Sequence, residues 1–311
     1  AVLGMLTGTL VTSVIQSSTA TIVLTVGLLS AGILNLRQSI SIVMGANIGT
    51  TVTAQIIRLM DINSSGAAFI EIFKPSTLAP LAVLCGIIFL KFVKSQKTKG
   101  IGMMLMGFGI LFTGLMGMTE AVSPLSESQA FTDVLQKFSD VPILGILTGL
   151  ITTFIVQSSS AVIGMVQALS STGAFTFQTV YPLIIGINLG TCITTAIVCS
   201  IGTDKDAKRT GIAHILFNCI GTVLFMAAIP LLHHAGALNF IWGKPMNSGG
   251  IANFTTIFNL VTAVALLPFT NQLVKLTTVI VKDSPDDAEE AYPEMRTLDE
   301  KLFISPAVAL H

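Results

Sequence analysis

The chain has 311 residues, of which 52% are hydrophobic and only 10% are charged, and its formal net charge is zero. Soluble globular domains carry about 25% charged residues, so the composition excludes an ordinary soluble domain and indicates a polytopic membrane protein. The apolar runs are long and continuous and do not alternate with period two, which favours transmembrane helices over a β-barrel.

The first predicted element is a re-entrant helical hairpin. Residues 1–15 and 20–34 are apolar, and a polar Gln16-Ser17-Ser18 run separates them. A membrane span needs about 20 apolar residues, whereas at 1.5 Å per residue each of these arms reaches only about 20 Å. We therefore expect two short arms joined at a polar tip. Non-helical backbone at that depth is tolerated only where it lines a cavity or is buried in protein.

The next predicted element is a discontinuous transmembrane helix. Residues 38–60 are long enough to span the membrane, but a Gly-x-Asn-x-Gly-Thr run at 45–50 interrupts them. We predict that the centre of this helix is unwound. Continuous spans are then predicted at 77–92 and 100–118, followed by a connector that runs through residue 140.

The second half of the chain repeats this order. Residues 145–198 match residues 4–57 with no gap and a constant shift of 141, and 19 of the 54 aligned positions are identical. The match predicts a second hairpin with arms at 142–157 and 158–173. A second discontinuous helix is predicted at 178–201, and continuous spans at 210–232 and 251–281. A polar tail, 282–311, follows and is expected in the cytoplasm.

Basic residues give the predicted orientation. If each hairpin enters and leaves on one face, most Lys and Arg residues fall on a single side, which should be cytoplasmic. These residues are Arg37, Lys91, Lys94, Lys97, Lys99, Lys205, Lys208, Arg209 and Lys282, against Arg58, Lys74, Lys137 and Lys244 on the other side. The first hairpin then enters from the cytoplasm and the second from outside, so the two repeats are inverted, as in many secondary transporters.

The predicted fold is therefore an all-α polytopic membrane protein with two inverted repeats, each containing a re-entrant helical hairpin and a discontinuous transmembrane helix. Residues 1–118 form the first repeat with its connecting spans, and residues 119–281 form the second. Because a span at 100–118 leads into the second repeat and nothing comparable leads into the first, we expect a missing N-terminal helix. Residues 282–311 are expected to link to an absent soluble domain. The localisation expected is the inner (plasma) membrane, within the lipid bilayer.

The two hairpin tips carry the same neutral hydrogen-bonding groups. Their residues are Gln16, Ser17, Ser18 and Thr19 in the first half, and Gln157, Ser158, Ser159 and Ser160 in the second. Gln supplies a carbonyl acceptor and an amide donor, and the hydroxyls both donate and accept. Each tip precedes a helical arm whose free N–H groups and positive dipole end favour an anion, phosphate in particular.

The predicted helix breaks offer oxygen atoms that suit a hard cation such as sodium. Their polar residues are Asn47, Thr50, Asn188 and Thr191. Neither kind of motif contains Asp, Glu, Lys or Arg. An anion would therefore be held by neutral donors together with co-bound cations, which is consistent with coupled transport.

Close helix packing is the alternative interpretation of these small residues. It accounts for a lone Ser-Ser pair, but it does not account for Gln, which is costly in lipid and occurs twice in the same register. We therefore interpret the duplicated runs as functional. Asn218 and Asn259 lie in late spans, where they either support the site or form interhelical hydrogen bonds. His214, near Arg209, is interpreted as interfacial. The sequence shows no catalytic triad, Walker sequence or metal-cluster spacing, so we expect no enzyme.

The paired Gln-Ser-Ser-Ser/Thr motifs, each followed by Gly-x-Asn-x-Gly-Thr, resemble the type II sodium/phosphate cotransporters, specifically the bacterial branch. The resemblance covers nearly the whole chain and includes Phe217-Asn218 and Phe258-Asn259. It extends to Leu298-Asp299-Glu300-Lys301-Leu302 in the tail, which is similar to the junction to a cytoplasmic PhoU-like domain. Thr19 departs from the usual third Ser but keeps the hydroxyl, and Thr255-Thr256 stands where the family pattern has a His.

The resemblance implies sodium-driven symport of inorganic phosphate by alternating access, with an elevator-like motion of the hairpin core. Phosphate would bind at the eight tip residues. Sodium would bind at Gln16, Ser18, Asn47, Thr50, Gln157, Ser159, Asn188 and Thr191, with Asn218 and Asn259 in support. Sodium would be the coupling ion, no nucleic acid partner is expected, and a homodimer is expected from other scaffold-based carriers.

Two other functions remain open from the sequence. One is a phosphate-responsive membrane sensor or scaffold that signals through a cytoplasmic domain, which would bind the ligand without net flux. The other is a carrier of a different small oxyanion or of a carboxylate. The absence of Arg from the motifs weakens the carboxylate version, because carboxylates favour bidentate Arg.

Overall fold

The computed structural model describes residues 1–61, 75–122, 140–200 and 205–282, together with Pro124, Asp133 and Lys137. Within these residues the regular elements are helices, apart from an isolated bridge between Thr176 and Pro245. Five helical segments are long and apolar enough to cross a membrane. The predicted class, an all-α polytopic membrane protein, is confirmed. The tail beyond residue 282 lies outside the described residues, and so does most of the connector between the repeats.

The first hairpin consists of helices α1 (Val2–Ile15) and α2 (Ser18–Ser30). The turn depends on Gln16, which adopts the left-handed conformation with φ 60° and closes α1 by donating its N–H to the carbonyl of Thr12. Ser17 is extended and caps α2, because its hydroxyl accepts a hydrogen bond from the N–H of Ala20. The Gln-Ser-Ser run thus ends one helix and begins the next within three residues, as predicted.

The second hairpin, α8 (Pro142–Val156) and α9 (Ser159–Ser170), has the same turn. Gln157 also has φ 60°, and Ser158 caps α9 by accepting from the N–H of Ala161. Among the described residues, Gln16 and Gln157 are the only residues other than glycine with a positive φ. The sequence repeat is therefore also a repeat of backbone conformation.

The predicted unwound helix centres are wrong. Helix α3 (Leu36–Ile57) continues through Gly45 to Thr50, and α10 (Phe177–Ser200) continues through Gly186 to Thr191. The Asn side chain does not interrupt the helix, because it forms a hydrogen bond inside it: Nδ2 of Asn47 donates to the carbonyl of Val43 at 2.9 Å.

The glycines of these helices serve close packing instead. A Cβ added at Gly45 would lie 1.9 Å from the carbonyl oxygen of Met5 in α1, and one at Gly186 would lie 2.0 Å from that of Ile146 in α8. The hairpin arms also have glycines at these contacts. A Cβ at Gly8 of α1 would lie 2.0 Å from the carbonyl oxygen of Ile42 in α3. Each hairpin is therefore seated on the long helix of its own repeat by backbone-to-backbone contact, the packing that small residues allow in membranes.

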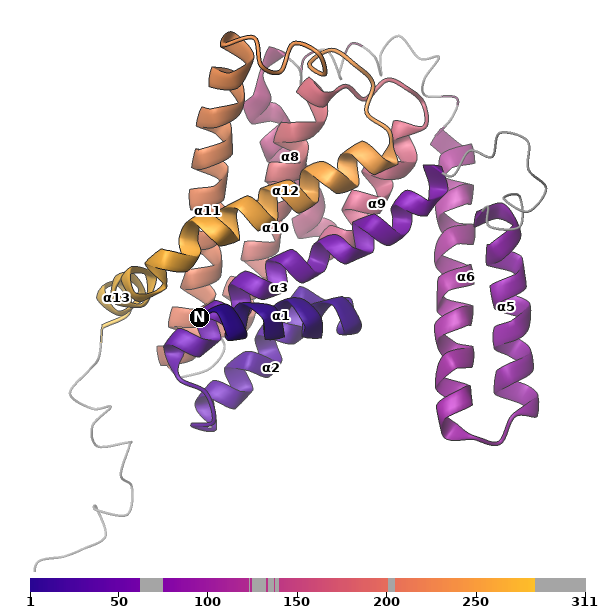
Figure 1. Ribbon diagram of the computed structural model, residues 1–311, viewed down its shortest axis with the longest axis horizontal. Coiled ribbons are helices and arrows are strands. Elements are labelled where there is room, and N and C mark those ends of the chain that lie inside the picture. The colour runs from indigo at the N-terminus through magenta and orange to yellow at the C-terminus, as the bar shows by residue number, and fades with distance from the viewer. Residues whose placement is uncertain are drawn as a thin grey trace, which may run out of the picture.

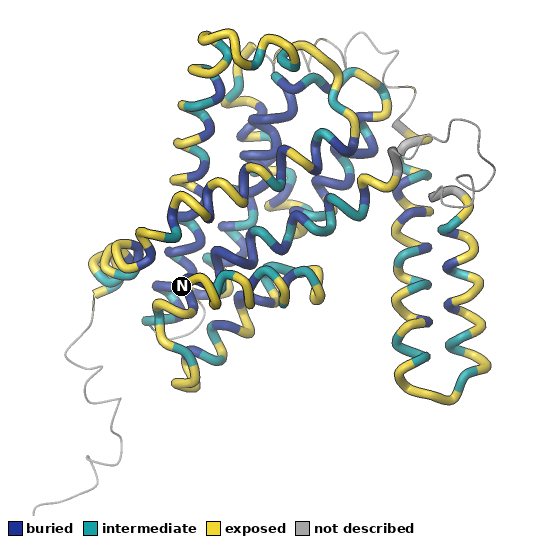
Figure 2. The backbone as a smooth tube through the Cα atoms, viewed as in Figure 1, coloured by how far each residue is buried: buried dark blue, intermediate teal, exposed yellow. Residues whose placement is uncertain are grey.

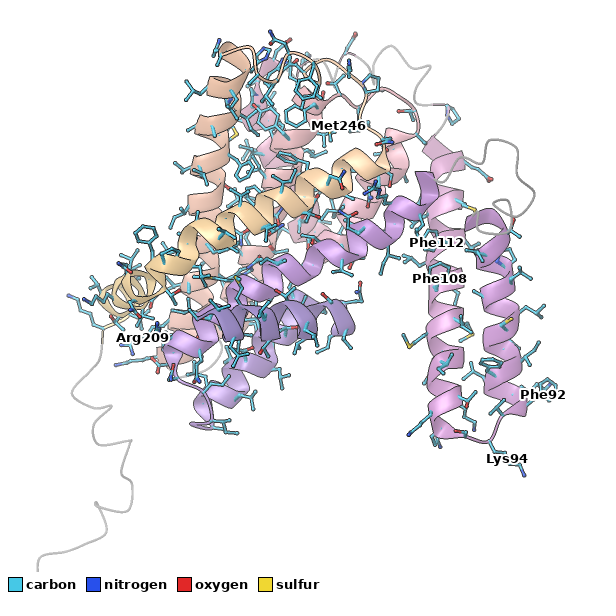
Figure 3. The ribbon with its side chains drawn as sticks, in the orientation of Figure 1. Phe92, Lys94, Phe108, Phe112, Arg209 and Met246 are labelled. Carbon is cyan, nitrogen blue, oxygen red and sulfur yellow. The ribbon has the colours of Figure 1, made fainter. Side chains whose placement is uncertain are left out.

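Helices α5 (Pro75–Phe92) and α6 (Gln96–Val122) form a separate pair at one side of the molecule (Figure 1). Both segments predicted as spans, 77–92 and 100–118, are helical; Gln96–Met118 is long and apolar enough to cross a membrane, whereas Thr77–Phe92 is a shorter apolar helix. Phe92 and Lys94 lie at the turn between them, and Phe108 and Phe112 lie on α6 (Figure 3). Apart from a few buried positions such as Phe112, the pair is largely exposed, whereas α10 is buried at the centre of the molecule (Figure 2).

Two further helices follow α10, namely α11 (Lys205–His234) and α12 (Ser248–Leu266). A 3₁₀ turn, η3 (Leu267–Phe269), separates α12 from α13 (Thr270–Ile280). The span predicted at 251–281 corresponds to one apolar segment, Ser248–Ile280, that is long enough to cross a membrane, but its α-helix is interrupted by the 3₁₀ turn. The physical reason is Pro268, which cannot donate the hydrogen bond that a continuous helix requires at that position.

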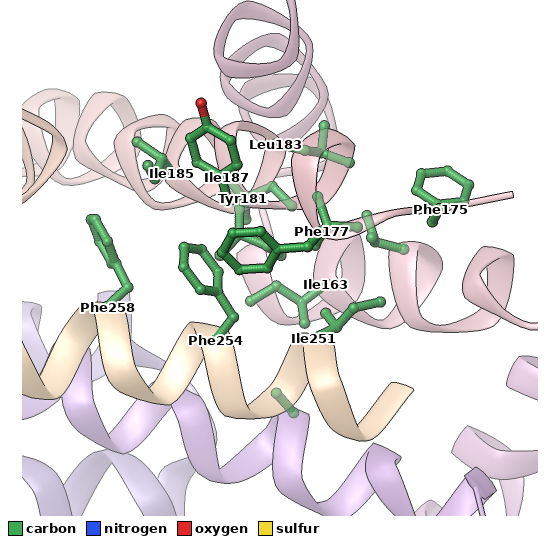
Figure 4. Close-up of a cluster of buried hydrophobic side chains, with 14 of the residues drawn as sticks. Ile163, Phe175, Phe177, Tyr181, Leu183, Ile185, Ile187, Ile251, Phe254 and Phe258 are labelled. Atoms are coloured by element: carbon green, nitrogen blue, oxygen red, sulfur yellow. The ribbon is translucent and has the colours of Figure 1, made fainter. Parts of the chain in front are cut away.

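The main apolar core packs α9, α10 and α12 together (Figure 4). Aromatic rings dominate it: Phe177 lies 5.6 Å from Phe254 and 5.8 Å from Tyr181, measured between ring centroids. Helix α9, the second arm of hairpin two, joins this core through Val162, Ile163 and Val166. The core therefore holds one of the two polar tips in place.

Candidate functional site

The two polar tips meet in one pocket, although they are 141 residues apart in the sequence. The pocket has a volume of about 50 Å³ and is lined by Gln16, Ser17, Ser18, Thr19, Thr153, Gln157, Ser158, Ser159, Ser160, Thr191 and Thr194. All eight residues predicted to bind phosphate are in this set. A single water molecule needs about 10–15 Å³ of such volume, so there is room for a small ion.

The electrostatics of the pocket arise from helix ends rather than from charged side chains. Helix α2 begins at Ser18 and α9 begins at Ser159, so the first turns of both helices border the same space. Free N–H groups and the positive dipole ends make such termini favourable for anions. None of the described residues that line the pocket is ionisable at neutral pH, and hydroxyls and amides supply the remaining contacts.

The two halves of the pocket are not equivalent at the Gln side chains. In the first half, Thr53 of α3 donates its hydroxyl proton to Oε1 of Gln16. The matching residue of the second half, Thr194, instead donates to the carbonyl of Thr191 at 2.8 Å. The Nε2 atoms of the two Gln residues do not differ, since each donates to the carbonyl three residues earlier in its own helix. The Gln16 side chain is thus held by α3, whereas α10 does not hold that of Gln157.

The predicted sodium residues divide into two groups. Gln16, Ser18, Gln157, Ser159 and Thr191 line the pocket, whereas Asn47, Thr50 and Asn188 do not. The hydroxyl of Thr50 donates to the carbonyl of Ala46 within α3. The structure therefore does not bring the whole predicted sodium set together.

The two Asn residues connect helices instead. Oδ1 of Asn47 lies 3.1 Å from Nε2 of His214, which joins α3 to α11. Oδ1 of Asn188 accepts a hydrogen bond of 3.2 Å from Nδ2 of Asn259, which joins α10 to α12. Of the two supporting residues, Asn259 makes this interhelical bond, and Asn218 donates to the carbonyl of His214 within α11.

His214, predicted at the membrane interface, is buried in the interior of the protein. Its side chain is 1% exposed and lies among α3, α10 and α11, where Sγ of Cys192 is 3.7 Å from its backbone carbonyl. The prediction rests on the neighbouring Arg209, a charged residue that favours a membrane surface. Arg209 lies near the beginning of α11 and pairs with Asp206 at 2.7 Å. One further turn of helix, about 5.4 Å, is enough to carry His214 into the interior.

A buried residue not singled out in the sequence, Gln167 of α9, anchors the second hairpin. Its Nε2 lies 3.0 Å from the carbonyl oxygen of Ala54 in α3 and 2.9 Å from Oγ of Ser248 in α12. The first repeat has the apolar Val26 at the matching position. When the two repeats are aligned, a polar residue stands in the second where the first has an apolar one, and this difference could have identified Gln167 from the sequence.

Thr153 and Thr194 line the pocket and were also missed. Both are identical to their first-repeat counterparts, Thr12 and Thr53, so identity between the repeats outside the two obvious motifs could have identified them. Among the described residues no group of His, Cys, Asp and Glu side chains could hold a metal ion through those ligands. The pocket is thus lined by hydroxyl and amide groups without permanent charge.

Comparison with known proteins assigns the family. The family model described as Na+/Pi-cotransporter matches residues 1–120 and 115–266. The protein YqeW of Bacillus subtilis is 30% identical over 271 residues, which cover 87% of this chain and 81% of YqeW. YjbB of Escherichia coli (strain K12), named for inorganic phosphate export, is 25% identical over 301 residues, which cover 96% of this chain and 51% of YjbB.

A mammalian relative is more distant. The sodium-dependent phosphate transport protein 2A of Rattus norvegicus is 23% identical over 197 residues, which cover 60% of this chain and 31% of that protein. The chain thus spans about half the length of YjbB and about a third of the rat protein. No solved structure matches. The family model alone extends over most of the sequence, and the chain belongs to the Na+/Pi-cotransporter family.

Proposed function

We propose that this protein is a secondary transporter that couples the movement of inorganic phosphate to sodium by alternating access. The observation that carries the proposal is the pocket in which both Gln-Ser-Ser tips meet. Family membership supports phosphate as the substrate and sodium as the coupling ion. A family of transporters also argues against an enzymatic role.

Phosphate is proposed to bind between the first turns of α2 and α9, at the eight tip residues. Helix N–H groups, Ser hydroxyls and Gln amides can all donate to its oxygens. Because none of the described lining residues is charged, the negative charge of phosphate would be only partly offset by the protein. A co-bound cation would offset the remainder, which gives a physical reason for coupling.

Sodium is proposed to bind at the pocket-lining subset Gln16, Ser18, Gln157, Ser159 and Thr191. Hydroxyl and carbonyl oxygens are ligands that a hard cation prefers. Asn47 and Asn188 would act by holding α3 and α10 in place, since their amide oxygens already have partners in α11 and α12. The elevator-like motion, the homodimer, the PhoU-like domain and the cytoplasmic side of the tail stay predictions.

Removing the hydroxyl of Ser159 tests the site assignment. We expect Ser159→Ala to reduce uptake of radiolabelled phosphate into proteoliposomes by at least tenfold, because a hydrogen bond to a charged group contributes about 1.5–3 kcal/mol. Gln157→Ala should have the same effect. The matched control is Ser171→Ala at the opposite end of α9, where the hydroxyl donates only to the carbonyl of Ala168. Unchanged uptake by correctly folded Ser159→Ala protein would refute the site.

Competition experiments separate the substrates. An excess of unlabelled phosphate or arsenate should abolish uptake of the label, whereas sulfate and citrate should not. Phosphate binding without net flux into sealed liposomes would instead favour the membrane sensor.

A further inference from the structure

The two halves of the pocket differ at a pair of equivalent threonines. Thr12 and Thr153 each lie four residues before the Gln of their tip, and both are buried. In the first half, the hydroxyl of Thr12 donates to Oγ1 of Thr21 at 2.9 Å. In the second half, Val162 replaces Thr21, so the hydroxyl of Thr153 has lost the partner that Thr12 has.

The hydroxyl of Thr153 is unsatisfied. The side chain is 1% exposed, and Oγ1 has no hydrogen-bond partner among the described residues. Other helical threonines nearby, such as Thr9 and Thr50, donate to the carbonyl four residues earlier. A buried donor without an acceptor is destabilising, and native structures contain few such groups. A ligand that accepts a hydrogen bond from the Thr153 hydroxyl would therefore gain more binding free energy than it would from a hydroxyl that already has a partner.

Thr153 also lines the pocket, whereas Thr12 does not. Most residues that line the pocket carry hydroxyls, and some of these hydroxyls already donate a hydrogen bond within the protein. Thr191 donates to the carbonyl of Asn188, and Thr194 donates to the carbonyl of Thr191. The free proton of Thr153 is a donor, and donors are what an oxyanion needs in a pocket without Lys or Arg. The asymmetry between the repeats thus keeps one additional donor available.

We propose that the Thr153 hydroxyl donates a hydrogen bond to the bound oxyanion, and that Val162 keeps this donor free by removing the competing acceptor present in the first repeat. The inference rests on the proposed function, because phosphate is the oxyanion in question. It adds a binding residue outside the Gln-Ser-Ser motifs and assigns a role to an apolar neighbour.

Four variants test the proposal through equilibrium binding of radiolabelled phosphate to the purified protein in saturating sodium. Thr153→Val should weaken binding on the order of tenfold, the equivalent of one hydrogen bond to a charged group. Thr153→Ser keeps the hydroxyl and should bind like the wild type. Val162→Thr should weaken binding several-fold without touching Thr153, because the new hydroxyl can accept from Thr153 as Thr21 does from Thr12. Thr12→Val, the symmetry-related control, should bind phosphate normally.

The sodium dependence of binding distinguishes the proposal from its alternatives. The sodium concentration for half-maximal phosphate binding should be the same in Thr153→Val as in the wild type, once phosphate is saturating. A shift in sodium dependence with unchanged phosphate affinity would overturn the proposal, and so would wild-type affinity in Thr153→Val. Should the wild type bind phosphate but fail to couple its transport to sodium, the proposed function would fail while the binding comparison would still decide the role of Thr153.

Discussion

Two side-chain pairs connect the helices that surround the pocket: Asn47 with His214, and Asn188 with Asn259. All four residues are buried. Burying an amide or an imidazole without hydrogen bonds costs free energy, so these two bonds stabilise the packing of the four helices. Because Asn47 and Asn188 lie at matching positions of the two repeats, each repeat uses the same residue to join its long helix to a helix of the second half.

Removing His214 should therefore destabilise the protein. His214→Ala leaves Oδ1 of Asn47 buried without a donor, and we expect a loss of about 1–3 kcal/mol in stability, in addition to the effect of the cavity. Thermal unfolding in detergent measures it. The control is His234→Ala at the end of α11, an exposed position where the change should be small. Equal unfolding temperatures for His214→Ala and the wild type would show that the pair does not stabilise the fold.

At the residue scale, the sequence predicts the hairpin tips but not the partners of the buried Asn residues. The duplicated Gln-Ser-Ser runs predict the tips, because polar residues between two short apolar segments are costly in a membrane unless they line a cavity or are buried in protein. The partners of Asn47 and Asn188 could not be predicted, since His214 is 167 positions from Asn47. Such pairs depend on tertiary packing and leave no periodic signal in the sequence.

At the scale of elements, helices α3 and α10 show why the predicted breaks were wrong. Gly and Asn favour irregular backbone in solution, so a Gly-x-Asn-x-Gly run in a span was interpreted as unwound. In this fold the two glycines lie one turn apart on the face that meets the hairpin arm, and Gly4 and Gly8 of α1 repeat the same spacing. The four-residue spacing of small residues predicts close helix packing, and here that interpretation is the correct one.

Adding a methyl group at these contacts should separate the hairpin from its helix. We expect Gly45→Ala to destabilise the protein by about 3 kcal/mol or more, because the new Cβ would meet the rigid backbone of Met5 at 1.9 Å. The matched control is Gly27→Ala in α2, where a Cβ would have no atom within 4 Å, and where Ala should be neutral or stabilising by about 0.5–1 kcal/mol.

The unfolding temperature and the phosphate uptake are measured for Gly45→Ala and for Gly27→Ala, and the two variants are compared. If Gly45→Ala were as stable as Gly27→Ala, α1 and α3 would have to separate without cost, and the glycine contact would not define the position of the tip.

On the scale of the whole molecule, two hairpins with the same turn conformation bring their tips to one pocket from opposite halves of the chain. The halves are not identical in detail. Gln16 is held by Thr53 of α3, whereas Gln157 has no such bond to Thr194, and only the second hairpin is anchored by a buried glutamine, Gln167. A pocket made by two similar but unequal halves is consistent with the proposed alternating access, in which one repeat moves against the other around the site.

The measurement that tests sodium-coupled phosphate transport most directly is uptake of radiolabelled phosphate into proteoliposomes that contain the purified protein. One sample has an inward sodium gradient and the other an equal potassium gradient. Sodium-coupled transport predicts transient accumulation above equilibrium with sodium and only equilibration or no uptake with potassium. Equal accumulation in the two gradients would contradict sodium coupling, and the absence of uptake in both, with phosphate binding retained, would contradict transport itself.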